Sequence, residues 1–142
     1  MAAFDRTRLS QIFGSAIRHD EEGSATSLTH SFGDEAFLKG HFPGFPVVPG
    51  VILLDGMILA TLHRFDHLRS VASDDIRSIA IESVAFYRPV LPGMTASFTS
   101  RVESFREAEG QFVAKCSVMV DGARHARAAL TLQTSHDDTP NN

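Results

Sequence analysis

Apolar residues occupy nearly every side of the stretch that follows the Pro-Gly pair at 49–50. A surface helix keeps one polar face, so a segment that is apolar all round, as residues 51–65 are, is normally buried. Proline and glycine suit the start of a helix, and the basic residues between 63 and 69 suit the negative end of its dipole. The pattern therefore predicts a central buried helix over residues 50–67.

The second half of the chain alternates between apolar and polar positions with the period of a strand. Residues 95–105 place small and apolar side chains on one face, and residues 111–120 alternate strictly. Asp121-Gly122 is a strong hairpin turn signal, and the alternation resumes over 126–132. Together with residues 76–86, these segments predict four strands in series and hence a meandering antiparallel sheet.

The first part of the chain is less regular. Residues 5–12 have the pattern of a short helix, and residues 16–32 are mixed and polar, with a hairpin turn signal at 21–24. A chain of 142 residues has the size of one domain, which we expect to span 1–134, followed by a polar tail at 135–142. The expected fold class is α+β, with an antiparallel sheet wrapped around one long buried helix.

Composition and charge narrow the classes of function. The net charge of −4 disfavours a nucleic-acid or anionic-membrane surface, because both need clustered positive charge. The single cysteine excludes an intrachain disulfide. The first residues carry charges where a signal peptide needs an apolar stretch, and no run approaches the ~18 apolar residues of a membrane span. We therefore expect a cytoplasmic protein.

A stiff loop precedes the predicted helix. Three prolines and three glycines fall within the eleven residues 40–50, which excludes a helix or a central strand there. The loop carries His41, and Asp55 follows inside the predicted buried helix, where a carboxylate needs a partner or an upward-shifted pKa. Residue types alone leave two interpretations open. The pair performs acid–base chemistry, or His41 is simply hydrogen-bonded and Asp55 favours the helix dipole.

The loop resembles the active-site signature of the 3-hydroxyacyl-acyl-carrier-protein dehydratases of fatty-acid synthesis (the FabA/FabZ type), which are hot-dog folds. These enzymes carry Gly-His-Phe-Pro-Gly, then Pro-Val-x-Pro-Gly, then an acidic residue fourteen positions after the histidine, and the spacing from His41 to Asp55 is the same. A second block at 84–93 is similar to the Phe-x-Arg-Pro-Val-x-Pro-Gly-Asp segment of the family. In element order the likeness covers roughly residues 32–132.

The resemblance implies a separate catalytic role for each of three residues. His41 would be the base that takes the C2 proton, and Asp55 would serve the leaving hydroxyl, directly or through a water. Gly50 would offer its backbone N–H to the thioester carbonyl, where enolate charge develops. Imidazole accepts protons near neutral pH, and desolvation makes a carboxyl group able to donate one.

The resemblance also suggests that Phe42, Pro49 and Leu59 contact the substrate. At three positions, however, the sequence differs from the family pattern. Most of the shorter enzymes of the family have Glu at the position of Asp55, whereas the longer relatives have Asp. The family commonly has Gln where Leu59 stands, and Asp where Met94 stands. These mixed features suggest a specialised pathway, such as polyene, polyketide or modified-lipid synthesis.

The expected partners are an acyl carrier protein or coenzyme A thioester and a second copy of the chain. In the resembling enzymes the histidine and the carboxylate of one site come from different subunits, so the resemblance implies a homodimer with two shared sites, which could assemble further. Gly56 fits close packing of backbones, either at such an interface or within one subunit. Two interpretations of five arginines stay open, a rim that attracts an acidic carrier protein or the phosphates of coenzyme A, and a scatter of solvated charges: Arg88, Arg101, Arg106, Arg124 and Arg127.

We expect no cofactor and no metal. The chain has no Gly-x-Gly-x-x-Gly fingerprint, Walker loop or Cys-x-x-Cys. His63 and His67 have a spacing that binds zinc, but no third ligand is evident and the helix dipole explains them better. Cys116 is expected in the core. Two rival functions remain: a hot-dog acyl thioesterase, and a non-catalytic subunit that binds acyl chains or a partner enzyme.

Overall fold

The computed structural model describes residues 6–13, 16–20, 24–33, 35, 38, 46–69, 76–106 and 109–134. The tail expected at 135–142 lies outside these residues. The elements, in chain order, are α1 (Arg6–Phe13), β1 (Ile17–Asp20), β2 (Ala25–Ser31), α3 (Gly50–Arg69), β3 (Ile76–Phe86), β4 (Thr95–Arg106), β5 (Gln111–Val120) and β6 (Ala123–Thr134).

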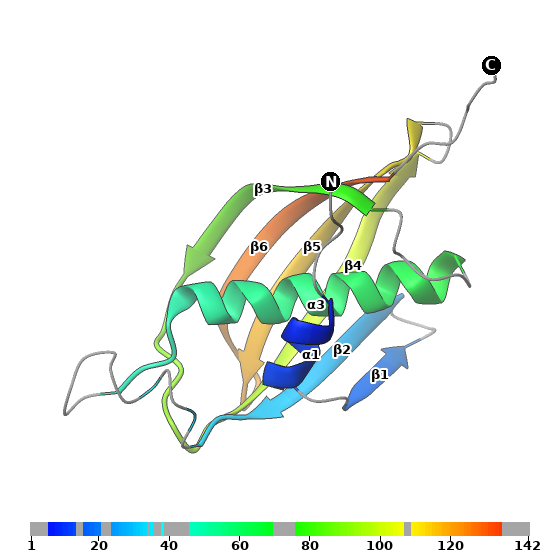
Figure 1. Ribbon diagram of the computed structural model, residues 1–142. Coiled ribbons are helices and arrows are strands. Elements are labelled where there is room, and N and C mark those ends of the chain that lie inside the picture. The colour runs from blue at the N-terminus through cyan, green and yellow to red at the C-terminus, as the bar shows by residue number, and fades with distance from the viewer. Residues whose placement is uncertain are drawn as a thin grey trace.

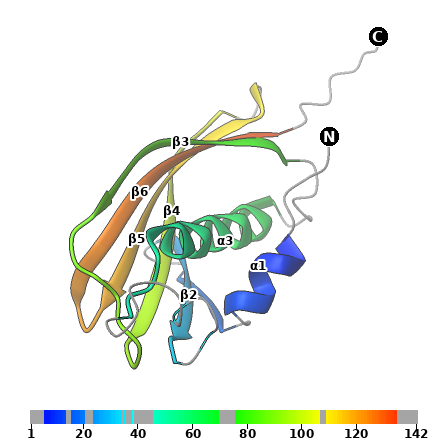
Figure 2. The same cartoon turned by 60° about the vertical axis from the view of Figure 1, so that its left-hand side comes forward.

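The six strands form one antiparallel sheet that curves around α3 (Figure 1). Figure 2 shows α1 against a side of α3 that the sheet leaves open. The expected α+β architecture, with a sheet wrapped around a long helix, is therefore confirmed. The buried helix is confirmed as well, and it extends two residues beyond the predicted end, to Arg69.

The order of the strands corrects one expectation. The order β1-β2-β4-β5-β6-β3 keeps the meander for β4, β5 and β6, but it places β3 beyond β6 at the edge of the sheet. The reason lies at β4, which pairs with β2 on one side and with β5 on the other, so no edge of it is free for β3. The chain from β3 to β4 therefore crosses the end of the sheet instead of turning back on itself.

The core lies between α3 and the concave face of the sheet. The alternating positions predicted within β5 and β6 are buried as expected, and Cys116 is among them. The ring of Phe65 on α3 stacks on Phe112 of β5, with the ring centroids 4.9 Å apart. The turn between β5 and β6 places Asp121 and Gly122 at φ 51° and 81°, the left-handed region that the Asp-Gly pair favours. Neither of the two described helices, α1 and α3, combines the length and the apolar character needed to cross a membrane.

Gly56 brings α3 close to β4. A Cβ atom at Gly56 would lie 2.4 Å from the Cδ2 and Cε2 atoms of Phe98, whose ring is fully buried. Phe98 in turn packs edge-to-face against Phe13 of α1, with the ring centroids 5.1 Å apart. Of the two explanations that the sequence leaves open, packing within one subunit accounts for this glycine.

Replacing Gly56 with valine is therefore expected to destabilise the fold by about 1–3 kcal/mol, the usual range for overpacking a close-packed core. Gly33 provides a matched control, because a Cβ atom there would meet nothing within 4 Å. The midpoint of urea unfolding measures both variants, and Gly33→Val should change the free energy of unfolding by less than about 0.5 kcal/mol. Equal stability of the two variants would contradict the packing described for Phe98.

Candidate active site

His41 and Phe42 lie outside the residues that the structure describes, but the chain is anchored on both sides of them. On the N-terminal side, the N–H of Leu38 donates to the carbonyl of Glu35 at 3.0 Å, and the Leu38 side chain is buried in the core. On the C-terminal side, the N–H of Val48 donates to the carbonyl of Val90 at 2.8 Å. The segment that carries the predicted base therefore begins and ends at fixed points of the fold.

Glu35, whose carbonyl accepts the N–H of Leu38, is itself held by hydrogen bonds to both of its carboxylate oxygens. Oε1 accepts the backbone N–H of Gly33 at 2.8 Å, and Oε2 is paired with Nε2 of His30 at 2.8 Å. The His30 ring packs edge-to-face against Phe13 and Phe32. Although burial acts to raise the pKa of Glu35, the hydrogen bonds from Gly33 and His30 lower it below its usual value. The carboxylate is thus held in its charged form six residues before His41.

The N-terminus of α3 presents backbone N–H groups at one end of the buried helix. The carbonyl of Pro49 accepts the N–H groups of Ile52 and Leu53 at 3.0 and 3.3 Å, so the helix begins at Gly50. The first N–H groups of a helix have no intrahelical acceptor and point toward the positive end of its dipole. A Cβ atom at Gly50 would lie 3.0 Å from Cζ of Phe86, so glycine also allows the end of β3 to approach this turn.

A groove of about 310 Å³ opens at this helix terminus. It is mostly apolar, and its size is at the lower end of the range for small-molecule sites. The described residues that line it come from the segment before α3, the first turns of α3 and the end of β3: Val47, Val48, Gly50, Leu53, Phe86, Tyr87, Arg88 and Pro89. An apolar groove with the N-terminus of a helix at its wall suits an acyl thioester, whose chain is apolar and whose carbonyl oxygen gains charge during reaction.

The wall of the groove formed by residues 86–89 is fastened to β6. The carbonyl of His125 accepts the N–H groups of Tyr87 and Arg88 at 2.8 and 3.3 Å, and its buried ring donates from Nδ1 to the carbonyl of Pro89 at 3.1 Å. Sequence reasoning assigned no role to Tyr87 or His125. Tyr87 falls within the second family-like block, whereas no sequence signal distinguishes His125 from its neighbours in the strand.

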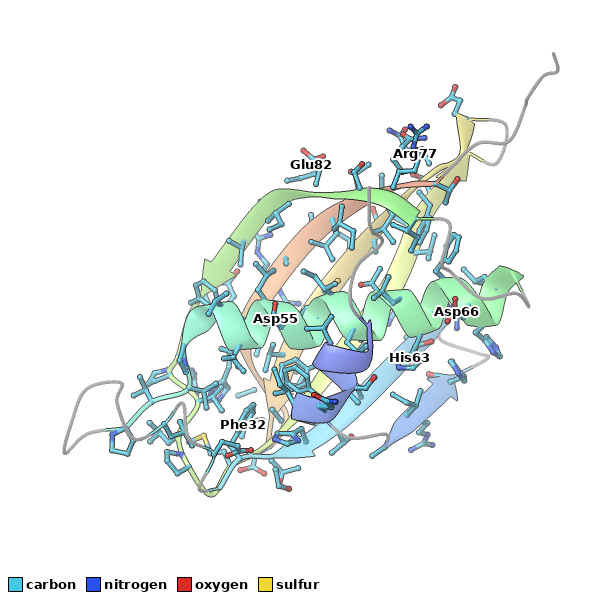
Figure 3. The ribbon with its side chains drawn as sticks, viewed as in Figure 1. Phe32, Asp55, His63, Asp66, Arg77 and Glu82 are labelled. Carbon is cyan, nitrogen blue, oxygen red and sulfur yellow. The ribbon has the colours of Figure 1, made fainter. Side chains whose placement is uncertain are left out.

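Asp55 lies where α3 passes from the surface into the core. One turn before it, Val51 is 63% exposed, and one turn after it, Leu59 is completely buried. Asp55 itself is half-buried, and Figure 3 shows it on the half of α3 that is nearer Gly50. A carboxylate in this position is partly desolvated and still accessible from outside the chain, as a proton donor must be.

Only some of the predicted site residues that the structure describes line the groove of the single chain. Of the predicted site residues that the structure describes, Gly50 lines the groove, whereas Asp55, Pro49 and Leu59 are not among its described lining residues. Leu59 is fully buried in the core of the chain.

Metal ligands are not assembled in the described part of the chain, where no group of three or more His, Cys, Asp and Glu residues is placed to hold an ion. The ring of His67 instead stacks on His19 of β1, with centroids 4.0 Å apart and planes 9° apart.

The comparisons with known proteins agree with this fold. The family model described as ApeI-like, ApeI dehydratase, matches residues 17–123. The 3-hydroxyacyl-[acyl-carrier-protein] dehydratase FabZ of Polynucleobacter asymbioticus is 37% identical over 108 residues, which cover 75% of this chain and 70% of that protein.

Two solved structures are similar in fold. The PaaI protein from the phenylacetic acid degradation operon of E. coli has a TM-score of 0.69 at 17% identity, covering 90% of this chain and 88% of that one. The dehydratase heterocomplex ApeI:P from Xenorhabdus doucetiae has a TM-score of 0.56 at 18% identity, covering 77% and 87%.

The chain is therefore a hot-dog-fold dehydratase, as its loop signature led us to expect. Within that class it belongs to the ApeI-like dehydratase family.

Proposed function

We propose that this chain interconverts 3-hydroxyacyl and 2-enoyl thioesters, with His41 as the base, Asp55 as the acid and Gly50 as the donor to the thioester carbonyl. The observation that carries the proposal is the apolar groove at the N-terminus of α3, which Gly50 lines. His41 and Asp55 keep the fourteen-residue spacing of the dehydratase signature on either side of that glycine.

In the dehydration direction the atoms balance between the two side chains. The imidazole of His41 removes a proton from C2, and the electron pair of that C–H bond becomes the C2–C3 double bond as the C3–O bond breaks. The carboxyl group of Asp55 gives its proton to the departing hydroxyl, which leaves as water. Charge that develops on the thioester oxygen is stabilised by the N–H of Gly50, at the positive end of the helix dipole.

The active form is a homodimer that completes each groove with the acid of the other subunit. The absence of Asp55 from the described lining of the groove of its own chain supports this arrangement. So does β3, a long edge strand, because an exposed apolar edge favours pairing with another chain. Apolar side chains on this strand are exposed, at 47% for Ile81, 39% for Val84 and 50% for Phe86.

A charge on this edge is expected to break the dimer. In Ile81→Glu, two copies would bring like charges and desolvated carboxylates to the same interface, which opposes pairing of the strands. Light scattering should report a mass near 15.5 kDa for this variant and twice that for the wild type. Leu68→Glu, at an equally exposed apolar residue on α3, is the control and should remain dimeric. A dimeric Ile81→Glu would contradict the use of this edge.

Incubation with a 2-enoyl thioester tests the proposed activity against its rivals. A dehydratase is supported if the conjugated double bond is lost without release of thiol. In the reverse assay, a 3-hydroxyacyl thioester should yield the 2-enoyl thioester. Release of free thiol would favour a thioesterase, a class that also occurs among the hot-dog folds. Binding without turnover would favour a non-catalytic acyl-binding subunit.

A further inference from the structure

The face of the sheet turned away from α3 carries a second depression, of about 320 Å³. Its floor includes Cys116 and Ala128, whose buried side chains belong to the core. Its walls are polar, and they comprise two hydroxyl groups and four cations on three neighbouring strands: Thr99, Arg101, Lys115, Ser117, Arg124 and Arg127. The catalytic proposal makes no use of this site.

The strand register gathers these groups in two adjacent rows. Thr99 of β4 is the partner of Ser117 of β5, which in turn is the partner of Arg127 of β6. In the next row, Arg101 of β4 stands directly opposite Lys115 of β5. Hydroxyl donors and cations therefore converge on this depression, and together they are the combination of donors that binds an oxyanion.

Like charges directly opposite each other on two strands destabilise a sheet, so the pairing of Arg101 with Lys115 has a cost. The ion pair of Lys115 with Glu103, at 3.9 Å, joins two side chains that are more than half exposed, and such pairs contribute little. None of the described residues that line the depression carries a carboxylate. On a chain with a net charge of −4, this local positive field favours an anionic ligand.

The depression adjoins the acyl groove. Nε of Arg127, which lines the depression, donates to the hydroxyl of Tyr87, which lines the groove, at 2.7 Å. A ligand with an apolar acyl end and an anionic end can therefore span both sites. Guanidinium groups with neighbouring hydroxyls suit a phosphate ester, because its oxygens accept several hydrogen bonds at once.

We propose that this depression binds the phosphate ester of the pantetheine arm that carries the acyl thioester, with Arg101, Lys115 and Arg127 as its cations and Thr99 and Ser117 as its hydroxyl donors. The proposal rests on the proposed function, since it assumes a thioester in the groove. Both coenzyme A and the prosthetic arm of an acyl carrier protein bear this phosphate ester, so the chemistry is shared and the source is decided by experiment.

The test compares three forms of one 2-enoyl group, carried on coenzyme A, on an acyl carrier protein and on N-acetylcysteamine, which has no phosphate. In the double variant Arg101→Ser, Lys115→Ser, the ratio of kcat/KM for each phosphate-bearing substrate to that for the phosphate-free one is expected to fall at least about tenfold. A hydrogen bond to a charged group is worth about 1.5–3 kcal/mol, and 1.4 kcal/mol is a factor of ten. The fall should appear in KM and should shrink at high salt.

The matched control is the double variant Arg18→Ser, Arg77→Ser, which removes two exposed cations outside the depression and should leave the ratio unchanged. A fall with both carriers assigns the site to the shared pantetheine phosphate, and a fall with one carrier assigns it to a phosphate of that carrier. An unchanged ratio with both carriers overturns the proposal.

A wild-type chain that fails to hydrate the N-acetylcysteamine thioester would instead count against the proposed function. Titration of coenzyme A without an acyl group into the wild type and the double variant then tests the phosphate site independently. Binding that the two substitutions weaken at least about tenfold supports the site, and equal binding to both proteins, or to neither, overturns it.

Discussion

The variant Asp55→Asn is expected to dehydrate a 3-hydroxyacyl thioester about 10²–10⁴-fold more slowly than the wild type, the usual contribution of a positioned acid or base. Asparagine keeps the size and most of the hydrogen bonds of the side chain but cannot donate a carboxyl proton. The loss should therefore fall on kcat. Initial rates over a range of substrate concentrations, with circular dichroism to confirm folding, measure it.

Asp66→Asn is the matched control for this experiment, because it removes a half-buried carboxylate from the opposite half of the same helix (Figure 3). It should retain a rate within a few-fold of the wild type. If Asp55→Asn kept nearly full rate, the acid would have to be another group, and Asp55 would be a structural residue at the surface of α3.

The second large effect is expected at His41. His41→Ala should lose about 10²–10⁴ in kcat, because no other base is proposed to reach the C2 proton. Free imidazole added to this variant should restore part of the rate, since a small base can occupy the space that the substitution opens. The same addition should have no effect on Asp55→Asn, which lacks an acid and not a base.

His19→Ala controls for the removal of a histidine in general, because His19 lies on β1 at the opposite edge of the sheet from β3. It should keep the wild-type rate. A fully active His41→Ala, or a loss of rate in both histidine variants with a common loss of structure, would remove His41 from the mechanism.

The elements of the fold could be predicted from the sequence because each has a strong local pattern. The helix that begins at Gly50 is apolar all round, and the strands 76–86 and 111–120 have their predicted bounds in the structure. The position of β3 could not be predicted in this way. Strand order depends on which edges remain free, and β4 is already paired on both sides by the hairpin partner β5 and by β2 from the first part of the chain.

The site was predictable only in part. The loop signature gave Gly50, which the structure places in the wall of an apolar groove, and it gave His41 and Asp55 as predictions that only experiment can test. The roles of Tyr87 and His125 depend on hydrogen bonds between β6 and the segment after β3, which no local pattern encodes.

The cationic depression depends on strand register in the same way. From the sequence alone, the five arginines were equally consistent with a binding rim and with scattered solvated charges. Three of them, Arg101, Arg124 and Arg127, line the depression together with Lys115. Arg101 and Lys115 are fourteen residues apart in the chain and become neighbours only through the pairing of β4 with β5.

The most direct test of the account is to mix the two inactive variants, His41→Ala and Asp55→Asn, under conditions in which subunits exchange. If each site takes its imidazole from one chain and its carboxyl group from the other, a mixed dimer contains one intact site. Random pairing makes about half of the dimers mixed, so an equal mixture should recover about a quarter of the wild-type rate. A mixture of exchanged subunits that stays as inactive as its components would contradict a site shared between two chains.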